Sequence, residues 1–344
     1  MRVLVIGGTS FIGLSVVGIL QRHGHEVTVF HRSQTENELL TEIQQILGDR
    51  ANLAAFKKEF EHLAPEVVLD MISYSEQNAL TFMNVFKDIA HRIVVVSSGD
   101  VYRAFGRLLR TEPGLPDPVP LAEDAPLREK LYPYRGTTPR SQDDPQRWMD
   151  DYDKIPIEHI TLNTPELPGT VLRLPMVYGP RDKQHRLFDY LKRMADSRPA
   201  ILLSQGIAHW HWTRGYVDNV AGAIALAVTN EHASRRIYNV GEEMALSTVE
   251  LLRNVGKVAG WQGEIVVVPD DQLPPHLRTA MDTRQNMTTN TMLIRSELGY
   301  IESISFIEGL ECAIAWERAN PPKEIDPAQF DYAAEDAVLA KLSK

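Results

Sequence analysis

A glycine-rich segment near the start of the chain has the residue types and spacing of a phosphate-binding turn. The apolar run 3–6 leads directly into Gly7, and a helical pattern follows over 11–20. A tight turn between a strand and a helix leaves N–H groups at the helix N-terminus free for a pyrophosphate. Because the pattern ends a strand and opens a helix, it predicts a dinucleotide site. The expected site residues are Gly7, Gly8, Thr9, Ser10, Phe11, Ile12 and Gly13.

The end of the second predicted strand indicates which dinucleotide fits. An acidic residue about 20 residues after the glycines normally holds the ribose 2′-hydroxyl of NAD. This chain has His31 and Arg32 there and no carboxylate. A guanidinium can bind a 2′-phosphate through two hydrogen bonds, whereas a carboxylate would repel it. The sequence therefore favours NADP over NAD, and Asp49 is expected to accept from the adenine amino group if its turn lies beside the pocket.

A pair of histidines stands in the aromatic segment 209–214. Imidazole is a common metal ligand, but His209 and His211 have no third ligand at a suitable spacing. We therefore expect no metal site and interpret the segment as packing or as an aromatic substrate wall.

The elements that must position these residues alternate between short apolar runs and helical patterns. Runs without polar alternation are typical of strands buried on both faces of a parallel sheet. The alternation predicts a doubly wound α/β fold with right-handed crossovers. The predicted strands cover residues 3–6, 26–30, 67–71, 93–97 and 171–174, and helices are expected at 11–24, 77–89, 187–196, 218–230, 247–259 and 304–318. The proline-rich stretch 103–147 is predicted to be a long loop on the active-site side.

The composition limits the class of protein. The 344 residues include 36 basic and 46 acidic side chains, giving a formal net charge of −10, and 43% are apolar. These values exclude a mainly disordered or collagen-like chain. Because there is no run of about 18 apolar residues, we expect no transmembrane helix. The lone Cys312 and the lack of a secretory pattern indicate a cytoplasmic protein.

Six motifs follow in the order seen in extended short-chain dehydrogenases/reductases. They are GGTSFIG at 7–13, GD at 48–49, SSGDVY at 97–102, LRLPMVYGP at 172–180, GYVDNVAGAIALA at 215–227 and YNVGE at 238–242. The chain thus resembles the NAD-dependent epimerase/dehydratase family of nucleotide-sugar enzymes. Within that family it looks most similar to the atypical branch that includes the chloroplast stem-loop RNA-binding proteins.

The resemblance implies a Rossmann-type domain that carries the cofactor and a smaller C-terminal α/β domain that closes over the substrate. We expect the first domain to comprise 1–178 and 212–243, and the second 179–211 and 244–344. Many relatives form dimers through helices that flank the serine and lysine motifs, so a homodimer is a further expectation.

The family carries catalysis on a serine or threonine and on the tyrosine and lysine of Tyr-x-x-x-Lys. The match places the catalytic hydroxyl at Ser98, with Ser97 beside the cofactor, and Lys154 matches the family lysine. Lys154 is also the residue expected to bind the cofactor ribose. Asp150 stands where the family has its tyrosine. Tyr152, two residues before Lys154, is a poor substitute, because helical residues at that spacing are separated by about 200° around the axis and cannot face one pocket.

The position at which the predicted helix of Lys154 begins decides whether Asp150 lies on that helix. Pro156 is best tolerated in a first turn, so the helix is expected to begin near Lys154, with Asp153 as its cap. Asp150 would then lie outside the helix. An aspartate near the lysine would be ionised and unable to donate a proton, so either another group is the acid or redox chemistry has been lost.

Three tyrosines are candidates for the missing acid. They are Tyr102, Tyr134 and Tyr178. Our choice is Tyr134, because Pro133 and Gly136 suit a tight, exposed turn.

The residues expected to contact the substrate also differ from the family pattern. Nucleotide-sugar members commonly carry an arginine six residues before the aspartate that matches Asp218, and this chain has Trp212 there. Arg214 is expected to take that role from a shifted position. The expected substrate contacts are Tyr102, Tyr178, Arg181, Trp212 and Arg214.

Two functions follow from these observations. The first is an NAD(P)-dependent oxidoreductase or epimerase acting on a sugar-like or other small polar substrate. The alternative is a non-catalytic cofactor-binding protein with an RNA-binding or regulatory role. The missing tyrosine at 150 favours the alternative. The net charge of −10 and the lack of a basic stripe with interleaved aromatic residues outside 209–214 disfavour RNA.

Overall fold

A seven-stranded parallel sheet forms the centre of the computed structural model, which describes residues 1–32 and 42–342. Its strand order is β10-β6-β5-β4-β1-β2-β3. The strands are β1 (Arg2–Ile6), β2 (Glu26–His31), β3 (Gln44–Leu47), β4 (Val67–Asp70), β5 (Arg92–Ser98), β6 (Gly169–Leu174) and β10 (Ile237–Asn239). The order reverses between β1 and β4, and ligands of such sheets bind beyond the carboxyl ends of the strands at that point. The predicted Rossmann-type fold is confirmed.

The five predicted strands all form, and their apolar runs are buried on both faces. Alternate residues of β1 belong to two separate core clusters, one with Val3 and Val5 and the other with Leu4 and Ile6. The first cluster packs under α1 (Phe11–Arg22) and α8 (Val217–Thr229); the second packs under α2 (Lys57–Leu63), α3 (Glu76–Phe86) and α5 (Lys154–Leu162). The sequence did not reveal β3, a short edge strand whose residues are mostly exposed.

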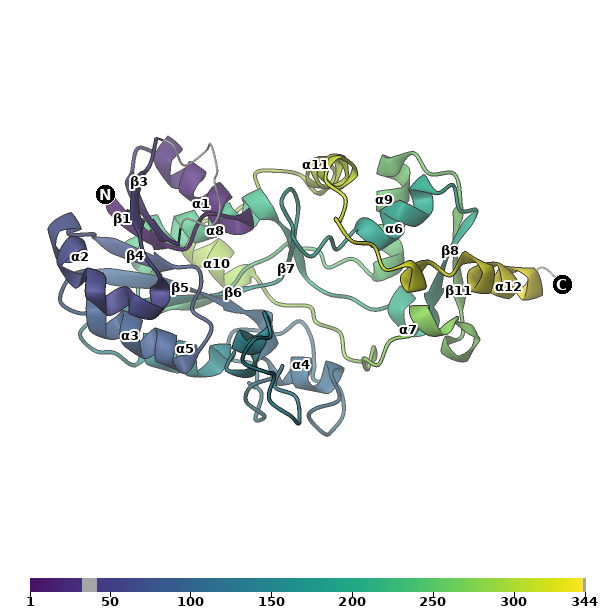
Figure 1. Ribbon diagram of the computed structural model, residues 1–344, viewed down its shortest axis with the longest axis horizontal. Coiled ribbons are helices and arrows are strands. Elements are labelled where there is room, and N and C mark those ends of the chain that lie inside the picture. Colours follow the sequence, from purple (N-terminus) through teal and green to yellow (C-terminus); the bar gives the residue numbers. More distant parts are fainter. Residues whose placement is uncertain (33–41, 343–344) are drawn as a thin grey trace.

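A second lobe, formed by segments on both sides of β10 in the sequence, lies on the right of Figure 1. Its core is a parallel pair of strands, β8 (Ala200–Ser204) and β11 (Glu264–Val268). The short parallel pair β7 (Met176–Tyr178) and β9 (Arg214–Tyr216) lies between the lobes. The helices of this lobe are α6 (Phe188–Ala195), α7 (Gln205–Ala208), α9 (Thr248–Ala259) and α12 (Tyr332–Leu342), and α11 (Phe306–Ala319) packs on α9. Helix α10 (Met292–Leu298) packs instead against β10 and α8, beside the central sheet. The four helices predicted beyond residue 180 are confirmed.

The proline-rich stretch is largely loop, as predicted, but it opens with a short helix, α4 (Arg103–Leu108). A buried ion pair holds this stretch to the body, because Arg128 pairs with Asp153 at 3.0 Å and both side chains are buried. Within the stretch, Arg103 pairs with Asp117 at 2.7 Å. The first contact positions the loop beside the start of α5, where the site is formed.

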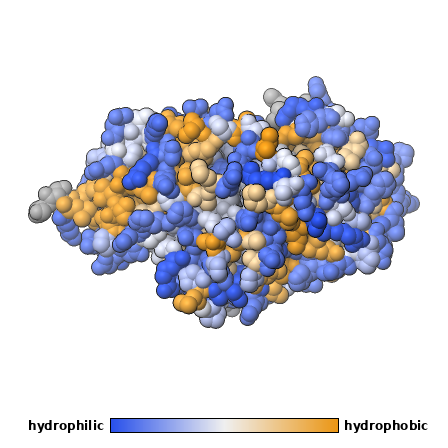
Figure 2. Space-filling view, turned by 180° about the vertical axis from the view of Figure 1, so that it is seen from behind, coloured by the Kyte–Doolittle hydropathy of each residue, from blue (hydrophilic) through white to orange (hydrophobic). Residues whose placement is uncertain are grey.

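The surface seen from behind is mixed (Figure 2). Hydrophilic residues cover most of this face, and apolar patches lie between them without joining into one apolar surface. Over residues 1–32 and 42–342, every helix is too short or too polar to cross a membrane.

Candidate functional site

The glycine-rich turn forms one wall of a cleft at the carboxyl ends of β1 and β2. Gly7 and Gly8 have φ angles of +95° and +90°, which favour glycine. A Cβ atom on Gly13 would lie 2.4 Å from the Gly8 Cα atom, so only glycine allows α1 to approach the turn this closely. The predicted roles of the glycines in the turn are thus matched by the backbone geometry.

The N-terminus of α1 is open to an anion. The Ser10 side chain is at the cap position but makes no capping hydrogen bond, and the first turn contains no acidic residue. Free N–H groups and the helix dipole both favour negative charge there. Phe11 and Ile12 pack against the core beneath the turn instead of lining the cleft.

The cleft has a volume of about 580 Å³ and brings together most of the predicted cofactor residues. Its lining residues are Gly7, Gly8, Thr9, Ser10, Phe30, His31, Arg32, Gly48, Asp49, Arg50, Ala51, Ile72, Tyr74, Asn78, Trp148 and Lys183. Asp49 uses one carboxylate oxygen to accept from the Ala51 N–H at 2.8 Å. The His31 Nε2 atom lies 2.8 Å from the Gln45 side-chain oxygen. The site therefore has the shape and the donors to hold a dinucleotide.

Sequence reasoning missed Arg50 at the base of this cleft. Its guanidinium donates to both carboxylate oxygens of Asp70, at 2.6 and 2.5 Å. Asp70 ends β4 and also accepts from the Ile72 N–H at 3.1 Å. The pair fixes the cleft floor and neutralises the charge of Arg50. A charged residue at the end of an otherwise apolar strand was the available signal.

Lys154 is buried between the sheet and the cleft. Its ammonium group donates to the Ser73 carbonyl at 2.5 Å and to the Val96 carbonyl at 2.9 Å. The side chain is only 3% exposed, and burial lowers the pKa of Lys154 to about 8. An ammonium has three hydrogens, so one remains for another acceptor.

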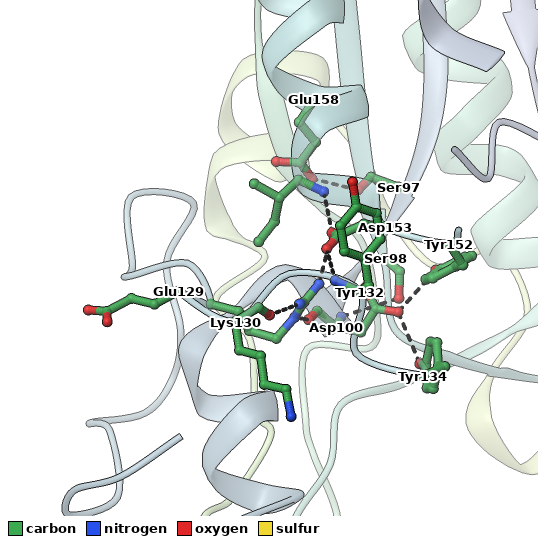
Figure 3. Close-up of polar contacts among 12 residues, drawn as sticks. Ser97, Ser98, Asp100, Glu129, Lys130, Tyr132, Tyr134, Tyr152, Asp153 and Glu158 are labelled. Carbon is green, nitrogen blue, oxygen red and sulfur yellow. Dashed lines mark hydrogen bonds and ion pairs between the residues drawn. The ribbon is translucent and has the colours of Figure 1, made fainter. Parts of the chain in front are cut away.

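Two tyrosine hydroxyl groups near this lysine meet at one buried carboxylate. Tyr152 and Tyr134 both donate to the same oxygen of Asp100, at 3.0 and 3.1 Å (Figure 3). Ser98 accepts from the Asp100 N–H at 3.2 Å, and its side chain also hydrogen-bonds Tyr152. The Lys154 Nζ atom lies 5.7 Å from the centroid of the Tyr152 ring. The structure thus brings together Ser98, Lys154 and Tyr134 and adds Tyr152 and Asp100.

The start of α5 corrects the expectation that Tyr152 is a poor substitute. Helix α5 begins at Lys154, and the Asp153 carboxylate caps it by accepting from the Ile155 N–H at 2.9 Å. The predicted cap is confirmed. Tyr152 lies outside the helix, so helical geometry does not turn it away from Lys154. Its ring instead packs 5.3 Å from that of Tyr134.

Asp150 does not belong to this cluster. It lies in a short 3-10 turn before α5, and its carboxylate is paired with Arg140 and, at 3.2 Å, with Arg147. The residue that stands four before Lys154 in the sequence therefore has a structural role. Tyr152, two residues before Lys154, belongs to the cluster instead.

Burial sets the protonation states of the cluster. Desolvation and the neighbouring Asp100 carboxylate raise the pKa of both Tyr134 and Tyr152. Desolvation also raises the pKa of Asp100, whose second oxygen lacks a hydrogen-bond partner among the described residues. The two tyrosines are therefore neutral donors near pH 7, as a general acid must be.

Tyr102 and Ser97 occupy structural positions that differ from the predicted ones. The Tyr102 hydroxyl is fully buried, donates to Asn239 at 2.6 Å and accepts from Arg173 at 3.0 Å. The Ser97 hydroxyl donates to Glu158 at 2.5 Å, away from the cleft. Both side chains serve the buried Arg173–Glu158 pair, so neither hydroxyl faces a ligand.

The other predicted substrate residues are dispersed. Tyr178 is buried and donates to Glu242 at 2.9 Å. Arg214 is buried and donates to two backbone carbonyls, those of Trp212 and Leu246, at 3.2 Å each. Arg181 lines a separate groove between α1 and α8. Only Trp212 shares an apolar cluster with Tyr134.

The histidine pair does not gather further ligands. His209 Nδ1 lies 2.9 Å from the Gln205 carbonyl oxygen. No group of three or more His, Cys, Asp or Glu side chains suited to a metal occurs in the ranges 1–32 and 42–342.

The fold and the cleft define a dinucleotide-binding protein of the extended short-chain dehydrogenase/reductase class. The sequence model of the NAD dependent epimerase/dehydratase family matches residues 3–107 and 130–241, which is more than half of the chain. The chain belongs to this family.

Comparisons with individual proteins agree with this assignment. The chain is 22% identical over 357 aligned residues to the chloroplast stem-loop binding protein of 41 kDa b from Arabidopsis thaliana, with 99% of this chain and 84% of the relative covered. It is 24% identical over 288 residues to 2'-dehydrokanamycin reductase from Streptomyces kanamyceticus, with 81% and 73% covered.

Solved structures show the same fold. The UDP-glucose 4-epimerase of Thermotoga maritima, solved with UDP-glucose, gives a TM-score of 0.66 at 20% identity, with 94% of this chain and all of that chain covered. The UDP-glucose 4-epimerase of Thermus thermophilus, solved with NAD, gives 0.66 at 21% identity, with 93% and 100% covered.

Proposed function

We propose that the protein is an NAD(P)-dependent oxidoreductase or epimerase acting on a sugar-like or other small polar substrate. The observation that carries this proposal is the cluster of Ser98, Tyr152 and Lys154, which adjoins the dinucleotide cleft through the cleft-lining rings of Tyr74 and Trp148. The cluster contains a proton donor, a second hydroxyl to polarise an oxygen, and a buried cation.

When bound, the nicotinamide ring would accept or supply a hydride. Tyr152 would give a proton to the substrate oxygen, or take one from it, and Ser98 would donate a hydrogen bond to the same oxygen. The third hydrogen of the Lys154 ammonium would bind the cofactor ribose. A positive charge near a phenol stabilises its anion, so Lys154 would also ease the transfer of the Tyr152 proton.

The first test of this proposal is a cofactor measurement on Lys154→Met. Methionine has similar bulk but cannot donate the ribose hydrogen bond, and hydrogen bonds to charged groups typically contribute about 1.5 to 3 kcal/mol. We expect the dissociation constant of the cofactor to rise at least tenfold in calorimetric titration. Equal affinity in the variant and the parent would contradict the assigned ribose contact.

The preferred dinucleotide is proposed to be NADP. Arg32 lines the cleft just after β2, at the position where an NAD-binding chain would carry a carboxylate. Arg32→Asp is expected to reverse the preference, because a bidentate contact is lost and a repulsion is gained. Calorimetric titrations with NADP and NAD measure both affinities. Indistinguishable affinities in the unchanged protein would disprove the preference.

The substrate class is proposed from the relatives and the site together. Several relatives and structural neighbours are described as enzymes of nucleotide sugars or of kanamycin, which supports a sugar-like substrate. Panels of nucleotide sugars and small carbonyl compounds should be screened for oxidation or reduction of the nicotinamide, followed by its absorbance. Epimerisation without net redox change requires product analysis of the same panels.

The alternative is a non-catalytic cofactor-binding protein that binds RNA. It is favoured by the similarity to a stem-loop binding protein, which extends over 99% of this chain. The net charge of −10 opposes it, because phosphate contacts depend on clustered cations. The alternative would be established by tight cofactor binding without turnover on any panel, together with salt-sensitive RNA binding. The same result would contradict the proposed enzymatic activity.

A further inference from the structure

Part of the cofactor cleft is lined by residues that the family motifs do not account for. Two of them are Trp148, which precedes α5, and Lys183, which follows β7. Lys183 belongs to the loop 179–187 between the central sheet and the second lobe. Its side chain is exposed.

The Lys183 side chain differs from those of two neighbouring cations, Arg50 and Lys154, in its hydrogen-bonding and ion-pair partners. Arg50 is neutralised by two hydrogen bonds from its guanidinium to Asp70, and Lys154 donates to two carbonyls. The neighbouring Asp182 is buried and accepts from Arg186 at 2.7 Å and from the Gln184 N–H at 3.0 Å. Within the described ranges no carboxylate pairs with Lys183, so its charge remains available to a ligand.

The glycine-rich turn presents matching donors in the same cleft. The α1 N-terminus has no acidic residue in its first turn, and the Ser10 side chain makes no capping hydrogen bond. A diphosphate between this turn and Lys183 would receive N–H donors from the helix and a further hydrogen bond from the ammonium.

The loop that carries Lys183 is fixed at its far end. His185 Nδ1 lies 2.8 Å from a carboxylate oxygen of Glu317 on α11, and the His185 ring stacks on Trp316 at 5.6 Å. The loop therefore holds Lys183 at the cleft while its next turn is tied to α11. A contact between Lys183 and a ligand would connect the cofactor to this C-terminal helix.

We propose that Lys183 binds the diphosphate of the cofactor and is a positioning residue for it. This inference rests on the proposed function, because it requires that the cleft hold a dinucleotide. Lys183, on the loop after β7, would thus add to the cofactor affinity that the glycine-rich turn provides.

The test compares Lys183→Met with the parent in calorimetric titrations of ADP-ribose and of adenosine. ADP-ribose contains the diphosphate, and adenosine contains none. We expect the dissociation constant of ADP-ribose to rise about tenfold, the scale of one charge-assisted hydrogen bond, while that of adenosine stays within about twofold. The affinity of the variant for ADP-ribose should also depend less on salt, because one screened ion contact is missing.

Two control variants sharpen the result. Lys192→Met removes a lysine on α6 that pairs with Asp196 at 2.6 Å and does not line the cleft, and it should leave ADP-ribose affinity unchanged. Lys183→Arg keeps the charge and should restore most of the affinity.

The outcomes separate this inference from the proposed function. If the parent fails to bind ADP-ribose, the proposed cofactor site is wrong, and the proposed role of Lys183 is wrong as well. If the parent binds it and Lys183→Met binds it equally well, the role of Lys183 is overturned and the proposed function stands. Equal weakening of ADP-ribose and adenosine would also overturn it, because the loss would then not involve the diphosphate.

Discussion

Tyr152→Phe is expected to lower turnover by roughly 10² to 10⁴, the usual contribution of one general acid. The substitution removes only the hydroxyl that donates to Asp100 at 3.0 Å and leaves the buried ring in place. Cofactor affinity should stay nearly unchanged, because the substitution removes only the hydroxyl that is assigned to the substrate oxygen and leaves the Lys154 ammonium in place. The measurement is the steady-state rate with the best substrate from the panels, together with a cofactor titration.

Tyr134→Phe is the matched comparison. Tyr134 donates to the same oxygen of Asp100, but the ammonium of Lys154 lies within 5.7 Å of the ring centroid of Tyr152. We therefore expect the smaller loss of turnover in Tyr134→Phe. A larger loss in Tyr134→Phe than in Tyr152→Phe would instead support Tyr134, the acid chosen from the sequence. Unchanged turnover in both variants would exclude this cluster as the source of the proton.

Arg173→Met is expected to reduce the free energy of unfolding by about 3 to 5 kcal/mol, the cost of leaving a buried charge without its partner. The side chains of Arg173 and Glu158 are only 2% and 1% exposed, and the guanidinium donates to the carboxylate at 2.7 Å. The same guanidinium donates to Tyr102 at 3.0 Å. Urea denaturation followed by circular dichroism measures the loss.

Two further variants serve as controls for the stability measurement on Arg173→Met. Arg135→Met removes an exposed pair with Asp151, whose side chains are 42% and 61% exposed, and it should cost less than about 1 kcal/mol. The double substitution Arg173→Met with Glu158→Met removes both buried charges and should recover part of the loss. A stability change in Arg173→Met no larger than that in Arg135→Met would contradict the importance of the buried pair.

Most of the dinucleotide-binding half of the protein could be predicted from the sequence alone. The strands are continuous apolar runs because both faces of the sheet are covered, and this pattern is local enough to read from β1, β2, β4, β5 and β6. The glycine-rich turn is equally local, since Gly7, Gly8 and Gly13 meet conformational demands set by residues a few positions away.

The sequence also indicated where α5 begins. Asp153 and Pro156 are a cap and a first-turn residue, and each preference arises from neighbouring backbone groups. The short edge strand β3 could not be recognised in the same way, because an exposed edge needs no apolar pattern.

Only the tertiary structure decided which hydroxyls share a site. Tyr134 comes from the proline-rich loop, Asp100 follows β5, and Tyr152 precedes α5, so their spacing along the chain contains no sign that they meet. Likewise, the burial of Tyr102 and Tyr178 follows from partners far away in sequence, Asn239 and Glu242. A tyrosine is a donor to a ligand or to the core depending on what surrounds its ring, and those surroundings are assembled from distant segments only when the chain folds.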